Sequence, residues 1–227
     1  TIVGNGFTLS RQGGSPQFRL LSNTAAGSLR IENLTLTGGS VGSFEDGGAI
    51  LNTGTLTLVD SHVLGNTSAD AGGGIANKTD GSTTLVNTTV SGNSASDLGG
   101  GIYSDFDSPV VITGSTISDN EVTSFGDGGG IFSYAGVAIS NSTITGNYAG
   151  FRGGGIGTLY AYAFLIGNSM ADTEVSYNLA GFSGGGIYSG PGSSEILVNV
   201  TVSGNEAGTR GGGVYTEFYG EASITQS

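Results

Sequence analysis

Apolar residues recur along this chain in two fixed settings, each with a distinctive neighbour. In the first setting, two or three glycines precede an aliphatic residue, which is Ile50, Ile75, Ile102, Ile131, Ile156, Ile187 or Val214. In the second, Val or Ile is followed three residues later by Asn66, Asn93, Asn120, Asn147, Asn178 or Asn205. These Asn residues are 27 residues apart, except for one step of 31. Such a period predicts a solenoid, in which each repeat buries its apolar side chains against its neighbours.

Each repeat contains short strands separated by turns. In the repeat that begins at Gly99, Ile102 starts one strand, and the polar residues 104–109 predict a turn. Residues 110–113 and 115–118 predict two further strands. Between them lies Gly114, a residue type that tolerates left-handed backbone, so we predict a bend there. Equivalent bends in other repeats are predicted at Asp60, Asn87 and Asn141. Because Asn-Gly hairpin turns are missing, we predict that the chain coils in one direction and pairs each strand in parallel with its equivalent.

The predicted fold class is therefore all-β, a right-handed single-stranded parallel β-helix of about eight coils with three short strands per coil. The whole chain, 1–227, is expected to form one domain. Residues 1–39 form irregular opening coils, 40–214 the regular coils and 215–227 a truncated last coil. The four extra residues of the longest repeat are placed in a turn at 166–172.

Alternation along the strands assigns side chains to the two sides of the coil. The Ile and Val residues after the glycines are predicted to point inward and to stack as apolar columns. The recurring Asn side chains are predicted to lie in turns and to hydrogen-bond from coil to coil, since a buried amide without partners costs about 1–3 kcal/mol. The next residue after each inward Ile or Val points outward, and four of these are aromatic: Tyr103, Phe132, Tyr188 and Tyr215.

Composition narrows the classes of partner. The net charge is −12, with only six Lys and Arg residues, so the chain repels nucleic acid and anionic lipid. We expect no nucleic-acid partner and no direct membrane insertion, because no stretch is long and apolar enough to span a bilayer. The chain has no Cys and therefore no disulfide or thiolate metal site.

The paired motifs resemble those of a known group of proteins. Gly47-Gly48-Ala49-Ile50, together with an apolar residue, two others and Asn, is similar to the repeat of polymorphic outer membrane proteins and related bacterial surface β-helices. The resemblance extends from about Thr35 to Val214. It departs in two respects: the second motif begins with Val or Ile where the family commonly has Phe, and six of seven glycine motifs read Gly-Gly-Gly. The resemblance implies a passenger or adhesin domain exposed on a bacterial surface, and it carries over no catalytic residue.

The aromatic column suggests an alternative, because aromatic faces stack on sugar rings. Tyr103, Phe132, Tyr188 and Tyr215 would then bind a polysaccharide, or help to cleave one. Asp105 and Asp107 are a candidate acid and base, and Arg152 and Arg210 are candidates to stabilise a lyase enolate; solvated turns and loops are the other interpretation. The single His, His62, lies on an outward strand position without a Ser or Asp constellation.

Three further polar arrays are candidates for binding or modification. Asp46, Asp70, Asp97 and Asp127 lie four or five residues before the anchoring Ile, where stacked carboxylates would suit Ca²⁺; charged loops are the alternative. Outward pairs such as Thr116 and Ser118 would form a ladder of the kind found on ice-binding solenoids; the alternative is that exposed parallel strands favour Ser and Thr in any case. Six Asn-x-Ser/Thr triplets begin at Asn33, Asn66, Asn77, Asn87, Asn141 and Asn199, and those at bends are expected to face inward.

The leading hypothesis is a non-enzymatic, secreted or surface-displayed β-solenoid that acts as an adhesin stalk or extracellular structural module. Its partners would be host or matrix glycans or proteins. The two ends are expected to be open strand edges, which favour further pairing. Either the rod continues beyond this segment, or residues 1–9 and 221–227 of neighbouring copies stack end to end into a filament.

Overall fold

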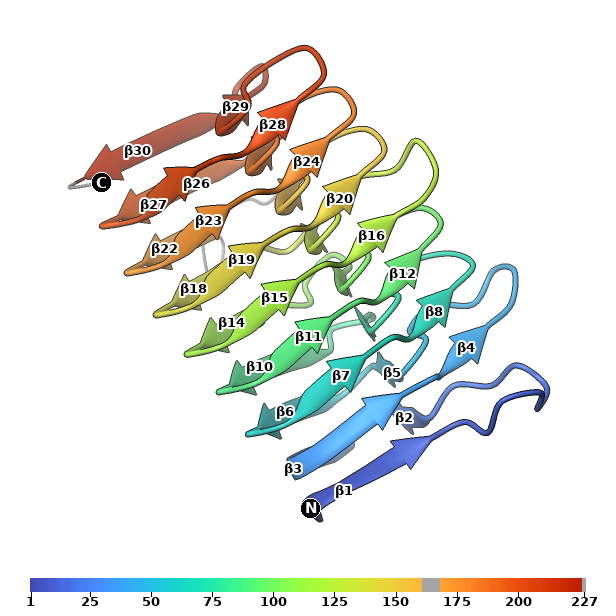
Figure 1. Ribbon diagram of the computed structural model, residues 1–227. Coiled ribbons are helices and arrows are strands. Elements are labelled where there is room, and N and C mark those ends of the chain that lie inside the picture. Colours follow the sequence, from blue (N-terminus) through green and yellow to red (C-terminus); the bar gives the residue numbers. More distant parts are fainter. Residues whose placement is uncertain (161–167, 226–227) are drawn as a thin grey trace.

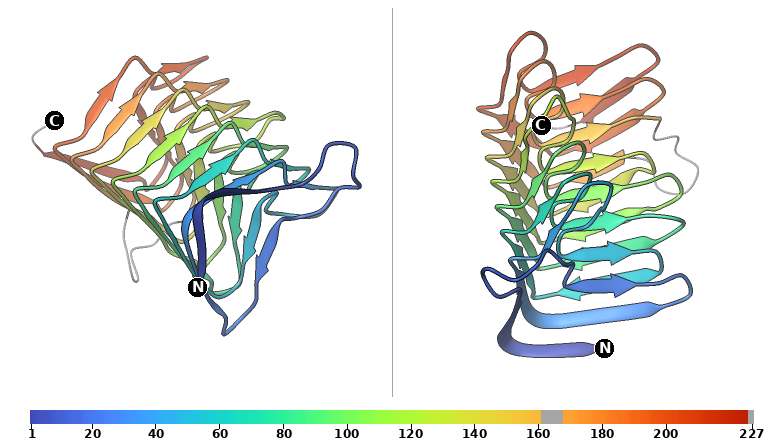
Figure 2. Two further views of the ribbon diagram at one scale, coloured as in Figure 1. Left: turned by 60° about the horizontal axis from the view of Figure 1, so that its bottom comes forward. Right: turned by 90° about the vertical axis from the view of Figure 1, so that its right-hand side faces the viewer.

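A computed structural model describes residues 1–160 and 168–225. The chain is a stack of coils whose equivalent strands form three sheets, here called A, B and C (Figure 1). Neighbouring strands pair in parallel, and the regular coils align with a shift of 27 residues, as in Thr89, Thr116 and Thr143. Sheet C has one strand per coil and eight strands. The predicted parallel β-solenoid of about eight coils is confirmed, and the coils lie one above another along a single axis (Figure 2).

Sheet C contains the strand that follows each glycine motif. Its strands are β2 (Leu21–Asn23), β5 (Ile50–Asn52), β9 (Ile75–Asn77), β13 (Ile102–Ser104), β17 (Ile131–Ser133), β21 (Ile156–Thr158), β25 (Ile187–Ser189) and β29 (Val214–Thr216).

Sheet A is formed by two rows of strands that meet at β3 (Ser28–Thr37), which pairs with β1 (Ile2–Ser10). The first row is β6 (Thr55–Val59), β10 (Ser82–Val86), β14 (Val110–Thr113), β18 (Val137–Ser140), β22 (Asn168–Ala171), β26 (Ser194–Val198) and β30 (Glu221–Thr225). The second row is β7 (His62–Leu64), β11 (Thr89–Ser91), β15 (Thr116–Ser118), β19 (Thr143–Thr145), β23 (Glu174–Ser176) and β27 (Thr201–Ser203).

The two rows of sheet A are separated by the predicted bend. The bend residues adopt φ between 46° and 59° in every coil: Asp60, Asn87, Gly114, Asn141, Asp172 and Asn199. Asn, Asp and Gly tolerate this left-handed region better than other residues. The change of direction at the bend therefore follows from residue type alone.

Sheet B is made of two-residue strands, all of which except the first follow the recurring Asn. They are β4 (Ser40–Val41), β8 (Thr67–Ser68), β12 (Ser94–Ala95), β16 (Glu121–Val122), β20 (Tyr148–Ala149), β24 (Leu179–Ala180) and β28 (Glu206–Ala207). The sequence predicted a loop in this place, because two residues are too few to show alternation. The strands form because the preceding Asn holds each coil in register, so that the amide of Glu121 bonds to the carbonyl of Asn93 at 2.9 Å.

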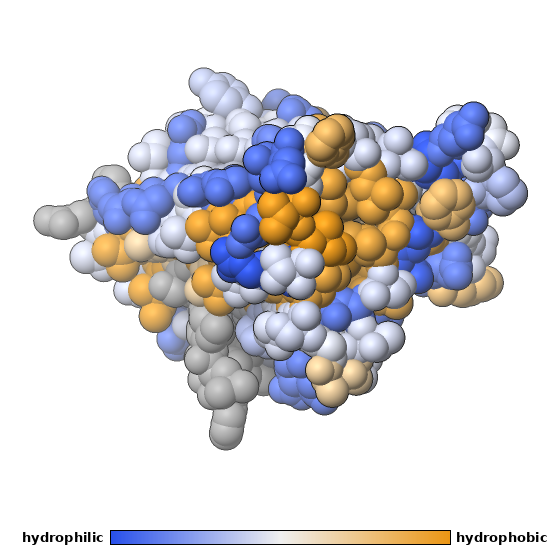
Figure 3. Space-filling view, turned by 90° about the horizontal axis from the view of Figure 1, so that it is seen from below, coloured by the Kyte–Doolittle hydropathy of each residue, from blue (hydrophilic) through white to orange (hydrophobic). Residues whose placement is uncertain are grey.

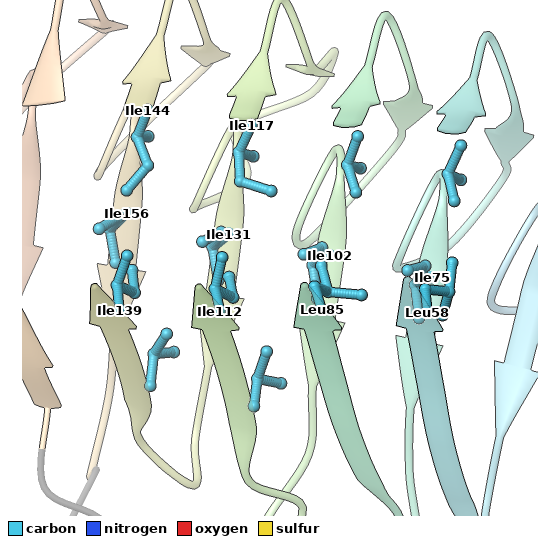
Figure 4. Close-up of a cluster of buried hydrophobic side chains, with 14 of the residues drawn as sticks. Leu58, Ile75, Leu85, Ile102, Ile112, Ile117, Ile131, Ile139, Ile144 and Ile156 are labelled. Atoms are coloured by element: carbon cyan, nitrogen blue, oxygen red, sulfur yellow. The ribbon is translucent and has the colours of Figure 1, made fainter. Parts of the chain in front are cut away.

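The interior is one apolar cluster that runs the length of the described coils. The inward Ile side chains of sheet C, from Ile50 to Ile187, are buried and pack against the Leu, Ile and Val residues of sheet A (Figure 4). Val214 packs against the same cluster but is partly exposed. The core is therefore built from columns of like side chains, as the period of the sequence predicts.

The first two glycines of each motif are needed for different reasons. The first glycine is left-handed in every motif, with φ between 56° and 71°. The second lies against neighbouring backbone: a Cβ on Gly100 would stand 2.5 Å from the carbonyl oxygens of Glu121 and Gly129. Real Cβ atoms do not approach backbone so closely, so the motif is a packing motif.

The extra residues of the longest repeat do not lie where the sequence analysis placed them. Residues 168–171 form β22 in register with β18 and β26, and Asp172 is the bend. The insertion therefore lies between the end of β21 and the start of β22. Residues 161–167 of this stretch are outside the described part of the chain, and so is part of the predicted turn.

Apolar side chains are exposed at both ends of the rod, among them Ile224 of β30 at the C-terminal end. Apolar side chains gather at the N-terminal end (Figure 3), where Ile2, Val3, Phe7 and Leu9 of β1 are exposed. An isolated antiparallel bridge between Phe18 and Ser40 lies against the edge of sheet B. End-to-end stacking through residues 1–9 and 221–227 stays a prediction.

Candidate functional site

The aromatic strip, Tyr103, Phe132, Tyr188 and Tyr215, lies on the outer face of sheet C. Side chains on this face form a second apolar cluster, separate from the core, in which Ala71 and Leu98 pack with Tyr103 and Phe132. Tyr103 is only 7% exposed, Phe132 and Tyr188 are fully buried, and Tyr215 is half-buried. The rings leave the outer side of their strands as predicted, but the first three have little or no exposed surface with which to bind a sugar.

The loops before the triple glycines cover this strip. Each loop ends in a left-handed glycine, such as Gly128 at φ 69°, which turns the chain back over the sheet. A Cβ on Gly128 would stand 2.6 Å from the Cβ of Phe132, so the loop backbone lies against the base of that side chain. The left-handed glycine thus converts an outward-facing column into a covered one.

A charged cluster lies over the C-terminal half of the strip. The Arg152 guanidinium donates to both carboxylate oxygens of Asp127, at 3.2 and 2.9 Å, and the Arg152 backbone amide donates to the same group at 3.0 Å. Its other arm donates to the Tyr188 hydroxyl at 2.7 Å and lies 3.6 Å from Glu217, and the Tyr188 hydroxyl donates to Glu217. The guanidinium also stacks 4.6 Å from the ring centroids of Phe151 and Tyr188.

These contacts shift the protonation equilibria of the cluster. Burial raises the pKa of the Asp127 carboxyl above its ordinary value, although the hydrogen bonds and charge of Arg152 act in the opposite direction. Burial, and then the hydrogen bond to Glu217, raise the pKa of the Tyr188 hydroxyl, so Tyr188 stays protonated at neutral pH. The cluster is a mutually satisfied clamp that ties loop and sheet together across four successive coils.

A smaller clamp lies over the N-terminal half. Lys78 pairs with Asp46 at 2.6 Å and places its ammonium 5.7 Å from the ring centroid of Tyr103. The second Asp46 oxygen accepts from the Ala71 amide at 3.1 Å. Burial, followed by the charges of Asp46 and Asp97, raises the pKa of Asp70. The loops here carry more acidic than basic side chains.

The four aspartates proposed to bind Ca²⁺ do not form one column. Asp46 and Asp127 directly precede a triple-glycine motif, whereas Asp70 and Asp97 lie one residue earlier, as the bridges between positions 71, 98 and 127 show. Asp46 and Asp127 are also neutralised by Lys78 and Arg152. In residues 1–160 and 168–225, no group of three or more His, Cys, Asp or Glu is arranged to hold a metal ion.

The other candidate catalytic residues are dispersed. Asp105 accepts a hydrogen bond from the Phe106 amide at 2.9 Å and so stabilises its own turn, while Asp107 is exposed and left-handed. Arg210 is exposed and contacts Tyr215 at 3.2 Å. His62 is exposed on β7, as its outward position predicts. Asp105 lies beside Tyr103 and Arg210 contacts Tyr215, at opposite ends of the strip, so these residues share no common centre.

The recurring Asn side chains form a ladder inside the coils. Asn93 donates to the side-chain oxygen of Asn120 at 2.9 Å and to the carbonyl of Val63 at 3.0 Å, and the same pattern joins Asn66, Asn93, Asn120, Asn147, Asn178 and Asn205. A second ladder, which the sequence analysis missed, joins Asn23, Asn52 and Asn77 at 2.7 Å. Its signal was Asn two residues after Ile50 and Ile75, which Ser or Thr replaces in later coils.

The bend Asn residues face outward, contrary to expectation. Asn33, Asn87, Asn141 and Asn199 are exposed, whereas the residue after each of them is buried. The left-handed bend explains this orientation, because it directs the bend side chain away from the coil and the following one into it. Asn66 and Asn77 are fully buried.

Several aromatic rings stand on the loop surface. Phe44 and Phe125, at loop tips on the sheet B side of the strip, are 93% and 90% exposed. Both lie six residues before an anchoring Ile, but only these two repeats carry Phe at that position, so the sequence offers no column that would single them out. Phe106 is half exposed and stacks on Tyr134, with ring centroids 4.5 Å apart.

Among the described residues, no helix has the length and apolarity needed to cross a membrane. The sequence model of the Chlamydia polymorphic membrane protein (Chlamydia_PMP) repeat matches residues 87–105 and 199–217. Each matched segment begins at a bend Asn, includes an Asn of the ladder and extends past the triple glycine to the end of a sheet C strand. The resemblance expected from the paired motifs is confirmed in these two segments. No curated protein and no solved structure matches the chain.

Proposed function

We propose that this chain is a non-enzymatic solenoid segment of a secreted or surface-displayed bacterial protein, in which it serves as an adhesin stalk or extracellular structural module. The observation that carries the proposal is the repeat match, which falls on equivalent positions of two coils separated along the axis. A repeat that specifies one coil after another produces length and stiffness, which are the properties of a stalk.

The charged side chains over the aromatic strip support a structural role. Asp127 is satisfied by Arg152, and Asp46 by Lys78. Charged groups that are paired in this way hold the loops against the sheet and are not available to bind a substrate. The large negative charge favours a self-repelling, soluble surface.

Surface display is tested with antibodies raised against the loop around Phe125, which is exposed in the folded chain. We expect these antibodies to label intact cells of the source organism without permeabilisation. An antibody against the buried ladder segment around Asn120 is the matched control, and it should label only denatured protein. Labelling by the loop antibody that requires permeabilisation would contradict the proposal.

Adhesion is tested separately with beads coated with the folded chain. We expect the beads to attach to host cells or matrix and soluble chain to compete, with Phe44 and Phe125 as the first contacts to examine, because exposed aromatic side chains mark interaction surfaces. The matched control carries Ser at both positions. Equal attachment of the two proteins would exclude these tips, and no attachment of either would leave a stalk without adhesive function.

A polysaccharide-binding role is a second candidate, favoured by one observation. The exposed ring of Phe106 stacks on Tyr134 beside Asp105, which places an aromatic surface next to a carboxylate. A glycan array with the folded chain and with Phe106→Ala tests this candidate, and a reducing-sugar assay tests for cleavage, which we expect to be absent. Array binding that survives Phe106→Ala would exclude this surface.

A further inference from the structure

The bend between the two rows of sheet A carries an alternating series of residues. From the N-terminal end the bend positions are Asn33, Asp60, Asn87, Gly114, Asn141, Asp172 and Asn199. Every one of the four Asn residues begins an Asn-x-Thr triplet, whose Thr lies at the next outward strand position. The two Asp residues are followed at that position by His62 and Glu174. Avoiding stacked carboxylates explains the alternation of Asn with Asp, but it does not require Thr.

The bend presents the reactive parts of the triplet together. The middle residue turns inward and is buried: it is Leu34, Thr88, Ser142 or Val200. The buried hydroxyls are used locally, since Thr88 donates to the carbonyl of Val86 at 2.9 Å and Ser142 to that of Ser140 at 2.7 Å. The Asn amide and the Thr therefore lie on the outer side of the coil.

At two of the four Asn bends, the Asp of the preceding coil holds the Asn amide without using both of its hydrogens. Asn87 donates to Asp60 at 3.3 Å, and Asn199 donates to Asp172 at 2.6 Å. An amide nitrogen carries two hydrogens, so one remains for another bond. The hydrogen bond fixes the direction of the Asn side chain, whose Asp partner lies in the neighbouring coil.

Two other triplets in the same chain are closed. Asn66 and Asn77 are fully buried; the Asn66 amide donates to Asn93 in the first ladder, and the Asn77 amide donates to the carbonyl of Ser108. The same three-residue pattern is thus sorted by the fold into four accessible and two inaccessible copies. The chain contains its own matched controls.

We propose that Asn33, Asn87, Asn141 and Asn199 are acceptor sites for N-linked sugars. The amide nitrogen forms a bond to the anomeric carbon of a hexose donated by a sugar diphosphate. The bond from that carbon to the diphosphate oxygen breaks, the diphosphate leaves with the electron pair, and the nitrogen loses one proton. At Asn87 and Asn199 the remaining N–H still donates to Asp60 and Asp172, respectively.

The spacing of the sites suits modification of a rod. Sites two coils apart are separated by about 9.6 Å at a strand spacing of about 4.8 Å, and the coil between them carries a short Asp or Gly at the bend. The four sites follow one edge of the solenoid. This inference does not depend on the proposed stalk or adhesin role.

The test uses the folded full chain, UDP-glucose and a soluble asparagine glycosyltransferase that accepts Asn-x-Ser/Thr, followed by peptide mass spectrometry. We expect hexose at the four bend Asn residues and none at Asn66 or Asn77. Synthetic peptides that contain residues 60–83 should accept hexose at both, because they lack the fold. The chain purified from its natural source should carry hexose only at bend positions.

Two variants separate acceptor chemistry from structure. Thr89→Val removes the hydroxyl of one triplet and retains Asn87, so hexose at Asn87 should fall to background while the other three sites are unchanged. Thr116→Val alters the equivalent strand position in the Gly114 coil and should change nothing. The inference is overturned if the folded chain accepts no hexose while the peptides do, if Asn66 and Asn77 are modified as readily as the bends, or if the natural protein is unmodified.

Discussion

Truncation of one ladder amide, Asn120→Ala, is the sharpest test of how the coils are joined. The Asn120 side-chain oxygen accepts from the backbone amide and the side-chain amide of Asn93, at 3.0 and 2.9 Å. Its side-chain nitrogen donates to the carbonyl of Val90 and to Asn147, both at 3.0 Å. Asn120 is fully buried, so water cannot replace these contacts in the intact fold.

The cost follows from the groups left behind. Alanine leaves two buried donors of Asn93 without an acceptor, and each costs about 1–3 kcal/mol. Asn147 keeps the donation from the backbone amide of residue 120 at 3.0 Å, which limits the loss on that side. We therefore expect the free energy of unfolding to fall by about 2–6 kcal/mol. This is a large fraction of the total stability of a typical protein domain, which is about 5–15 kcal/mol.

Urea unfolding followed by far-UV circular dichroism measures this difference. Asn87→Gly is the control, because that Asn is exposed, lies at φ 49° where Gly is unstrained, and makes a single 3.3 Å bond to Asp60. The control should change the unfolding free energy by less than about 0.5 kcal/mol. If Asn120→Ala and the control unfold at the same urea concentration, the ladder does not stabilise the coil and the argument fails.

A charge in the ladder adds a pH dependence. Asn120→Asp removes the donor and places a carboxylate against the carbonyl of Val90 and the side-chain oxygen of Asn147. The folded-state pKa of this carboxyl should lie above the unfolded value of about 3.9. Because the folded state then binds the proton more tightly, the variant should be most stable at low pH and lose stability as pH rises above about 4.

Three further predictions concern the glycines and the loop charges. Gly100→Ala should lower the free energy of unfolding by about 3 kcal/mol, because the added Cβ would overlap two carbonyl oxygens. The control is Gly13→Ala, which should be neutral in the same urea titration because no atom lies within 4 Å of the added Cβ. Arg152→Leu should cost about 3 kcal/mol at pH 7 by leaving the Asp127 carboxylate buried and unpaired, and the loss should shrink at low pH as Asp127 protonates; a loss independent of pH would contradict the ion-pair account. Asp70→Asn should stabilise the chain slightly at neutral pH. The pKa of Asp70 is raised in the folded state, so the wild-type chain loses stability as the pH rises above the ordinary pKa of an aspartate. This part of the plot of stability against pH should disappear in the variant.

The period of the sequence was sufficient for the fold and for the inner columns. Equal spacing places Asn120 above Asn93 and Ile102 above Ile75 whatever the loops do, because parallel strands in register repeat every position. The bends could be predicted for the same local reason, since Asp60 and Asn87 are residue types that accept left-handed backbone. Each of these conclusions depends on residue type and spacing alone.

Accessibility was decided by the tertiary structure. Alternation correctly places Tyr103 on the outer face of its strand, but whether that face meets solvent depends on the path of a loop that turns at a left-handed glycine. Likewise, nothing within an Asn-x-Ser/Thr triplet distinguishes Asn77 from Asn87; one lies inside the coil and the other on its edge. The physical reason is that the alternation along a strand fixes only the side of the backbone on which a side chain lies. Its burial depends on which segments, distant in sequence, cover that side.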